Sequence, residues 1–141
     1  MSLTPARRSG VLRSNAGVAL IETAFVLPIL LILVIGVLDF GRAFHTKSLL
    51  DQAAREGARL AVITTPDPGL VTARVNALLA PAGITATSVT VDGPTPGTNL
   101  DTVTVTATFT WMTPGIYALA GGTGNTMTMS SQCVMRHESG T

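Results

Sequence analysis

The stretch AFVLPILLILVIGVL, residues 24–38, decides the fold because it contains neither a charged nor a polar side chain. Extending it back to Val18 adds only Glu22 and Thr23 as polar residues. The resulting segment has about the 20 residues that an α-helix needs to cross a bilayer. We therefore expect residues 18–38 to form a transmembrane helix, which Pro28 should bend because proline removes one backbone hydrogen bond.

Basic residues before this segment predict its orientation. Arg7, Arg8 and Arg13 precede the first acidic residue, so residues 1–17 form a basic leader in a chain whose formal net charge is only +1. The positive-inside rule places this leader in the cytoplasm and the chain after the span outside it. The alternative is a secretory signal peptide that releases a soluble domain starting near residue 45, although DFGRAF at 39–44 offers no small-x-small cleavage site.

The helical pattern continues beyond the apolar segment to about Ile63, so residues 39–65 are expected to extend the same helix outside the membrane. An unbroken helix from Val18 would be about 70 Å long. Small residues four apart, Ala53, Gly57 and Ala61, form a face that another backbone could approach closely. A broader stripe of apolar or small residues recurs at spacings near three and four, and it comprises Phe40, Phe44, Leu50, Ala54, Gly57, Ala58 and Ala61.

Charged residues stand where this helix would leave the membrane. Asp39 and Arg42 form an i, i+3 pair, which on a solvated or headgroup-facing rim contributes a few tenths of a kcal/mol. In the alternative interpretation they set the register against a partner helix, together with Arg55, Glu56 and Arg59.

Residues 66–141 predict a small α+β domain. Asp67 and Pro68 favour the start of a short helix that ends at residues 81–83. Its apolar face would hold Val71, Val75, Leu78 and Leu79.

The period then changes to two, which is typical of strands. Residues 102–111 alternate threonine with Val103, Val105, Ala107, Phe109 and Trp111, and residues 126–135 place Met127, Met129, Cys133 and Met135 on one face. Residues 84–92 form a weaker strand whose apolar phase shifts between Ala86 and Val89, which indicates a bulge. The expected fold is thus α+β and pilin-like, with the outer half of the long helix packed on a small antiparallel sheet of about three strands.

The sequence does not predict an enzyme. Cys133 and His137 would supply only two metal ligands, and Cys133 is expected to be an inert core thiol on the apolar face of its strand. No catalytic cluster and no phosphate-binding loop are present in the sequence. We therefore expect no catalytic residues, metal, cofactor or small-molecule substrate, and the near-neutral charge argues against nucleic acid as a partner.

The string GVALIE, residues 17–22, follows the basic leader and begins the apolar helix. It resembles the processing site of type IV pilin-like precursors. The resemblance implies that a membrane-bound prepilin peptidase cuts after Gly17, so that Val18 becomes the N-terminus and Glu22 the fifth residue. The new α-amine of Val18 would need a carboxylate nearby in a bundle of low dielectric, and Glu22 of the same or a neighbouring subunit could supply it.

Further motifs make this resemblance more specific: Leu27–Pro28, DFGR at 39–42 and AREGAR at 54–59. Residues 17–62 are similar to the TadE-like family, the minor pilin-like proteins of tight adherence (Tad/Flp) pilus systems. Thr23 stands where major pilins usually have tyrosine, which indicates a minor component.

The family resemblance implies a non-enzymatic, single-pass protein of the bacterial inner membrane. Its expected partners are membrane lipid, the prepilin peptidase, other pilin-like subunits and the inner-membrane pilus assembly machinery. The alternative is a membrane-anchored binding or adhesin domain that belongs to no filament.

Overall fold

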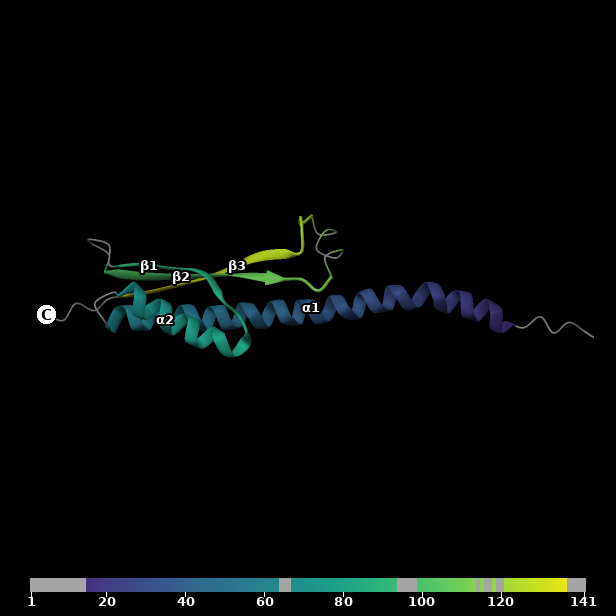
Figure 1. Cartoon of the computed structure of the whole chain (residues 1–141), viewed down its shortest axis with the longest axis horizontal. Coiled ribbons are helices and arrows are strands. Elements are labelled where there is room, and N and C mark those ends of the chain that lie inside the picture. Colours follow the sequence, from purple (N-terminus) through teal and green to yellow (C-terminus); the bar gives the residue numbers. More distant parts are fainter. Residues whose placement is uncertain are drawn as a thin grey trace, which may run out of the picture. The chain divides into compact units, whose positions relative to one another are not determined.

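The structure is a computed structural model that describes residues 15–63, 67–93, 99–113, 115, 118 and 121–136. The elements are the helices α1 (Asn15–Ile63) and α2 (Pro68–Leu79), the short 3-10 helix η1 (Ala80–Ala82) and the strands β1 (Ala86–Asp92), β2 (Leu100–Thr110) and β3 (Thr126–Arg136) (Figure 1). The chain divides into two compact units, Met1–Val34 and Ile35–Thr141. The expected α+β fold, with a long N-terminal helix and three antiparallel strands, is confirmed.

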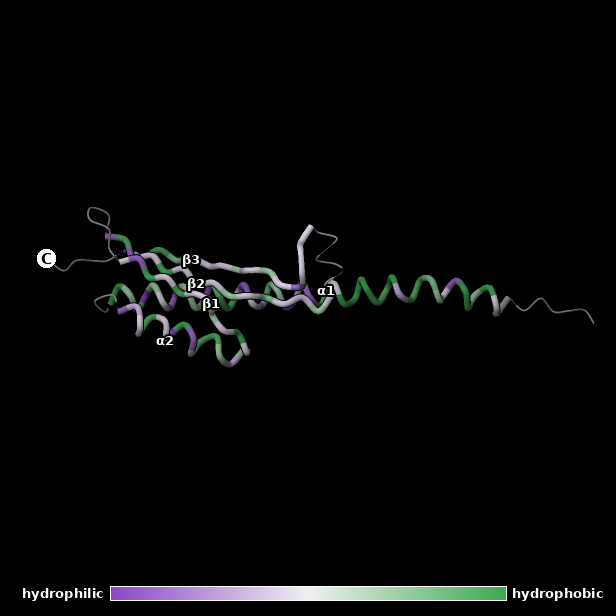
Figure 2. The backbone as a smooth tube through the Cα atoms, turned by 45° about the horizontal axis from the view of Figure 1, so that its top comes forward, coloured by the Kyte–Doolittle hydropathy of each residue, from purple (hydrophilic) through white to green (hydrophobic). Residues whose placement is uncertain are grey.

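The described part of the first unit is the apolar beginning of α1. Every side chain from Val18 to Val34 is exposed. Most of these residues are hydrophobic, as the green colour of this part of the helix in Figure 2 shows. Pro28 lies inside the helix without ending it. By length and composition, α1 is able to cross a membrane, and its most apolar window has no buried residue. Such a surface requires lipid or other apolar side chains around it.

The second unit contains a meander of three antiparallel strands in the order β1-β2-β3. Val103 in the central strand pairs with Val91 of β1 and Cys133 of β3. The register of β1 shifts between Ala86 and Ser88, where the sequence predicted a bulge. The connection between β1 and β2 includes residues 94–98, which lie outside the described residues.

The core of this unit forms where one face of β2 meets α1 and α2. Asp67 caps α2 by accepting a hydrogen bond from the Gly69 N–H at 2.8 Å. Of the apolar face predicted for α2, Leu78 is instead 37% exposed. The fully buried core residues are Leu50, Ala53, Ala54, Ala58 and Ala61 of α1, Val71, Val75 and Leu79 of α2, and Val103, Val105 and Ala107 of β2. Burying each valine or leucine contributes about 1.5–3 kcal/mol.

One part of the predicted apolar stripe of α1 is wrong. Phe40 and Phe44 are 55% and 73% exposed, whereas Asp39, Ala43 and Thr46 are buried. Both sets of residues have helical spacing, so periodicity alone could not separate them. The sheet covers only one side of the helix, and the two phenylalanines lie outside the covered stripe.

Candidate functional site

The residues of the expected processing site lie at the beginning of α1. Gly17, Val18 and Glu22 are all exposed. A Cβ added at Gly17 would meet no described atom within 4 Å outside the helix backbone. Thr23 donates a hydrogen bond from its hydroxyl to the Ala19 carbonyl at 2.8 Å, so its side chain is directed along its own helix. Processing after Gly17 stays a prediction, and its site is sterically open in the described part of the chain.

Asp39 is the most constrained polar side chain of α1 and does not lie on a solvated rim, so that expectation is wrong. Its side chain is 1% exposed. It accepts hydrogen bonds from the Met112 N–H at 3.0 Å, the Thr113 N–H at 3.0 Å, the Thr113 hydroxyl at 2.8 Å and Arg42 at 3.0 Å. The carboxylate thus joins α1 to the chain that follows β2.

These contacts also determine the charge state of Asp39. Burial acts to raise its pKa, but the hydrogen bonds from Thr113, Met112 and Arg42 together hold the pKa below its ordinary value. The sequence indicated only the pair with Arg42. Thr113 and Met112 were missed because they are 73 or more positions away along the chain.

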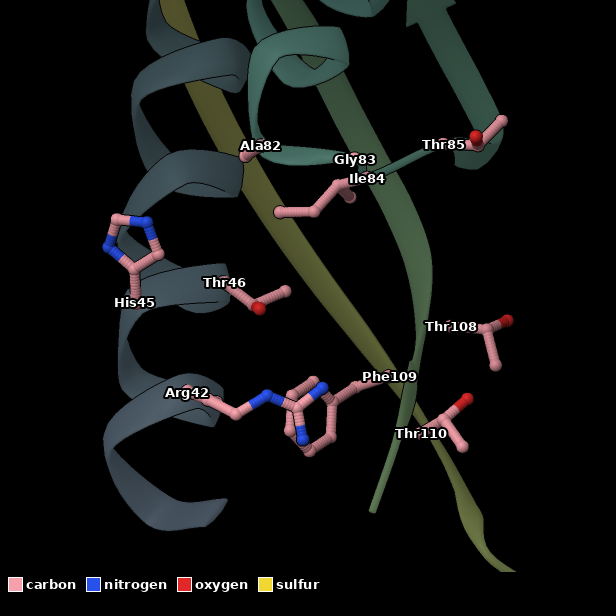
Figure 3. A pocket seen from close by; sticks show the side chains of 10 residues that line it. All are labelled: Arg42, His45, Thr46, Ala82, Gly83, Ile84, Thr85, Thr108, Phe109 and Thr110. Carbon is pink, nitrogen blue, oxygen red and sulfur yellow. The ribbon is translucent and has the colours of Figure 1, made fainter. Parts of the chain in front are cut away.

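Arg42 belongs to an aromatic cluster beside this carboxylate. Its guanidinium lies over the Phe109 ring at 5.3 Å from the centroid, as Figure 3 shows. Trp111 packs edge-to-face against Phe109 at 5.2 Å and against Phe40 at 5.7 Å. The end of β2 is therefore fixed to α1 by one buried carboxylate, by edge-to-face ring contacts and by the Arg42 guanidinium over Phe109.

Arg42 and Phe109 of this cluster also line an open groove of about 310 Å³ between α1 and the segment 82–85. Thr108 and Thr110 belong to its rim, but their side chains point away from α1 (Figure 3). Arg42, a charged residue in the lining, already binds Asp39. The described lining therefore offers no group of side chains arranged for catalysis.

No cluster of three or more His, Cys, Asp or Glu in the described residues is placed to hold a metal ion. Cys133 is half-buried, carries a free thiol and packs against the core, as the strand pattern predicted. His137, its suggested co-ligand, lies outside the described residues.

The face of small residues on α1, which the sequence predicted to let another backbone approach, is packed within the same chain. Ala53, Gly57 and Ala61 are buried. A Cβ at Gly57 would lie 3.2 Å from Val103 Cγ1 and 3.2 Å from Val75 Cγ2. These residues are therefore occupied within the subunit and are not exposed to another one.

A second polar contact joins α1 to β3. Asp51 accepts a hydrogen bond from the Ser131 hydroxyl and forms an ion pair with Lys47 at 2.9 Å. Lys47 also donates to the Ser130 carbonyl at 2.6 Å. The hydrogen bonds from Ser131 and Lys47 lower the pKa of Asp51. The sequence held one indication of this contact. Ser131 is a hydroxyl residue on the face of β3 where the other alternating residues are apolar.

Asp39 and Asp51 predict acid sensitivity of the second unit. Because folding lowers the pKa of each carboxyl, the unfolded chain binds more protons below the ordinary Asp pKa of about 3.9. Their contribution to stability is therefore complete at neutral pH and is lost as the pH falls below about 4. Urea unfolding of the full chain in detergent, followed by fluorescence of the only tryptophan, should show this loss.

The double variant Asp39→Asn/Asp51→Asn should have a flatter dependence between pH 5 and pH 3 than the unaltered chain. An equally steep dependence in both proteins would assign the acid sensitivity to other groups.

Comparison with known proteins shows a family to which part of α1 is similar. The model of the family described as TadE-like protein matches residues 17–59. No curated protein and no solved structure shows significant similarity to the chain. The matched segment begins at the glycine of the expected processing site, continues through Asp39 and Arg42, and includes Gly57. The helix from Gly17 to Arg59 is therefore similar to the TadE-like family, as the sequence motifs predicted.

Proposed function

We propose that this chain is a minor pilin-like protein of a Tad-type pilus system. Residues 18–38 anchor it in the bacterial inner membrane, with the leader in the cytoplasm and the α+β domain outside. It has no enzymatic activity and joins other pilin-like subunits during pilus assembly. The observation that carries this proposal is the TadE-like match over residues 17–59, whose first part is an exposed apolar helix.

Processing by a prepilin peptidase after Gly17 is the first step of the proposed function. The exposure of Gly17 and Val18 supports it, because a peptidase needs access to the bond that it cuts. Cleavage creates an α-amine on Val18, and the exposed carboxylate of Glu22 lies four residues further along the helix. A charge pair between these groups compensates the cost of placing either one among apolar helices.

The exposed apolar surface of α1 then makes the contacts with other subunits. Ala53, Gly57 and Ala61 are buried, with Gly57 against valines of α2 and β2, so they do not serve this purpose. Residues 18–34 expose large side chains on all sides of the helix. They are therefore the surface that meets lipid before assembly and neighbouring helices after it.

The structure also supports anchoring over release by signal peptidase. A cut near residue 45 would remove Asp39 and Ala43, both of which are buried in the second unit. The released domain would lose the carboxylate that holds Met112 and Thr113.

Mass spectrometry of the membrane protein tests the proposal. Co-expressed with its prepilin peptidase, the chain should begin at Val18, and Gly17→Leu should remain at the mass that includes residues 1–17. Gly10→Leu is the matched control, since it changes a leader glycine away from the cleaved bond. A chain that keeps Met1 or Ser2 despite active peptidase would contradict processing and favour an anchored binding domain.

A further inference from the structure

Apolar side chains remain exposed at one end of the second unit. Val37, Leu38, Phe40 and Phe44 of α1, and Met112 after β2, are each 55–73% exposed. We call these five residues the apolar rim. Residues 35–38 of the expected membrane span belong to this same unit. The rim therefore comprises the last residues of the expected span and the exposed apolar side chains next to them in the second unit.

The hydrogen bonds of Asp39 indicate the depth of the apolar rim in the proposed membrane. Asp39 directly follows the span that we propose for residues 18–38. The Met112 N–H lies 3.0 Å from the Asp39 carboxylate, so the end of β2 must stand at the same level of the helix. Phe44 is six residues beyond Leu38, which corresponds to about 9 Å. The polar layer of a bilayer extends about 5–8 Å beyond the hydrocarbon on each side. Phe40 and Met112, which lie beside Asp39, thus fall in this layer, whereas Val37 and Leu38 end the span below it and Phe44 lies at its outer boundary.

The chemistry of the rim fits that environment. Trp111 and Phe40 are in ring contact, and tryptophan is enriched at membrane interfaces. Among the described residues 35–46 and 108–113, Asp39 and Arg42 are the charged ones, and they neutralise each other at 3.0 Å. The Asp39 carboxylate already accepts hydrogen bonds from Arg42, Met112 and Thr113. Placing it in the headgroup layer therefore costs less desolvation free energy than placing an unpaired carboxylate there.

We propose that the apolar rim docks the α+β domain on the headgroup layer of the bilayer. The occupant is the phospholipid interface itself, bound through exposed aromatic and aliphatic side chains and not through net charge. This inference rests on the membrane span of the proposed function. It adds that the domain lies against the membrane surface before assembly and that this surface must leave lipid when a subunit is extracted.

Fluorescence quenching by brominated phosphatidylcholine tests the docking in vesicles that contain the full chain. Three variants carry one tryptophan each in a Trp111→Phe background: Leu30→Trp in the span, Met112→Trp in the rim and Leu70→Trp. Leu70 is 53% exposed and precedes Val71, which lies beside Gly57. Gly57 follows Asp39 by 18 residues on α1, which corresponds to about 27 Å along the helix axis. Leu70 therefore lies about this far along α1 from the level of Asp39.

Bromines near the headgroups should quench Met112→Trp more than bromines near the bilayer centre do. Leu30→Trp should show the opposite order, and Leu70→Trp should lose no fluorescence with either lipid. The natural Trp111 in the unaltered chain provides a second probe and should follow the order of Met112→Trp. Because the rim carries no net charge, the quenching should be equal with and without phosphatidylglycerol.

The three tryptophan variants distinguish a failure of the docking from a failure of the membrane span. If Leu30→Trp is quenched but Met112→Trp and Trp111 are not, the docking is overturned and the membrane span stands. If Leu30→Trp is not quenched either, the proposed span itself is wrong. Quenching of Met112→Trp that requires phosphatidylglycerol would also overturn the proposal, since it would show attraction by basic side chains.

Discussion

Replacing Gly57 with leucine should lower the free energy of unfolding by about 3 kcal/mol or more, since overpacking a rigid core is costly. A Cβ at this position would already lie 3.2–3.3 Å from methyl groups of Val71, Val75 and Val103. These three valines are fully buried, belong to two different elements and have stiff side chains. A leucine needs space for three further carbons, so α2 and β2 would have to move apart. Urea unfolding of the full chain in detergent measures the effect.

Gly41 offers a matched control on the same helix. It is exposed, and a Cβ there would meet no described atom within 4 Å outside the helix backbone. Gly41→Leu should therefore raise the stability by up to about 1 kcal/mol through helix propensity. If Gly57→Leu and Gly41→Leu changed the free energy of unfolding equally, the close packing at Gly57 would contribute nothing to stability.

Removing the Asp39 carboxylate should have the second large effect. Asp39→Ala leaves the two N–H groups and the hydroxyl that now bind it without their acceptor, and it frees Arg42. The expected loss is about 2–4 kcal/mol, the range for a buried charged group with several partners. Trp111 precedes the released residues directly, so its fluorescence should shift as the end of β2 separates from α1.

Two variants separate this role from a general effect of charge. Asp39→Asn keeps one acceptor oxygen and should lose less than Asp39→Ala. Asp51→Ala removes a carboxylate that is 39% exposed, and it should cost only about 1 kcal/mol because partly solvated pairs contribute little. A loss at Asp51 equal to that at Asp39 would contradict the assigned importance of the buried contact.

Much of the fold and part of the candidate site are predictable from the sequence. The α1 helix, the capped α2 helix and the three strands follow from local periodicity and from turn residues. The bulge in β1 follows from a phase shift. The GVALIE string and the later motifs predicted a resemblance to the TadE-like family, and the match over residues 17–59 confirms this resemblance for that segment.

Contacts between distant segments were not predictable in the same way. The sequence presented Asp39 and Arg42 as a surface pair, because Thr113 approaches Asp39 only when β2 packs on α1. It presented Phe40 and Phe44 as part of the packed stripe, and the sheet covers another side of the helix. It likewise left open which side chains pack against Gly57.

The sequence by itself determined a long apolar helix, a small α+β domain and a TadE-like segment, because helix period, strand period and short motifs are local properties of the chain. The tertiary structure decided which face of α1 is buried, which carboxylate is enclosed and which aromatic side chains stay exposed. These choices depend on how β2 lies across the helix, and that packing is set by many weak contacts between residues far apart in the chain.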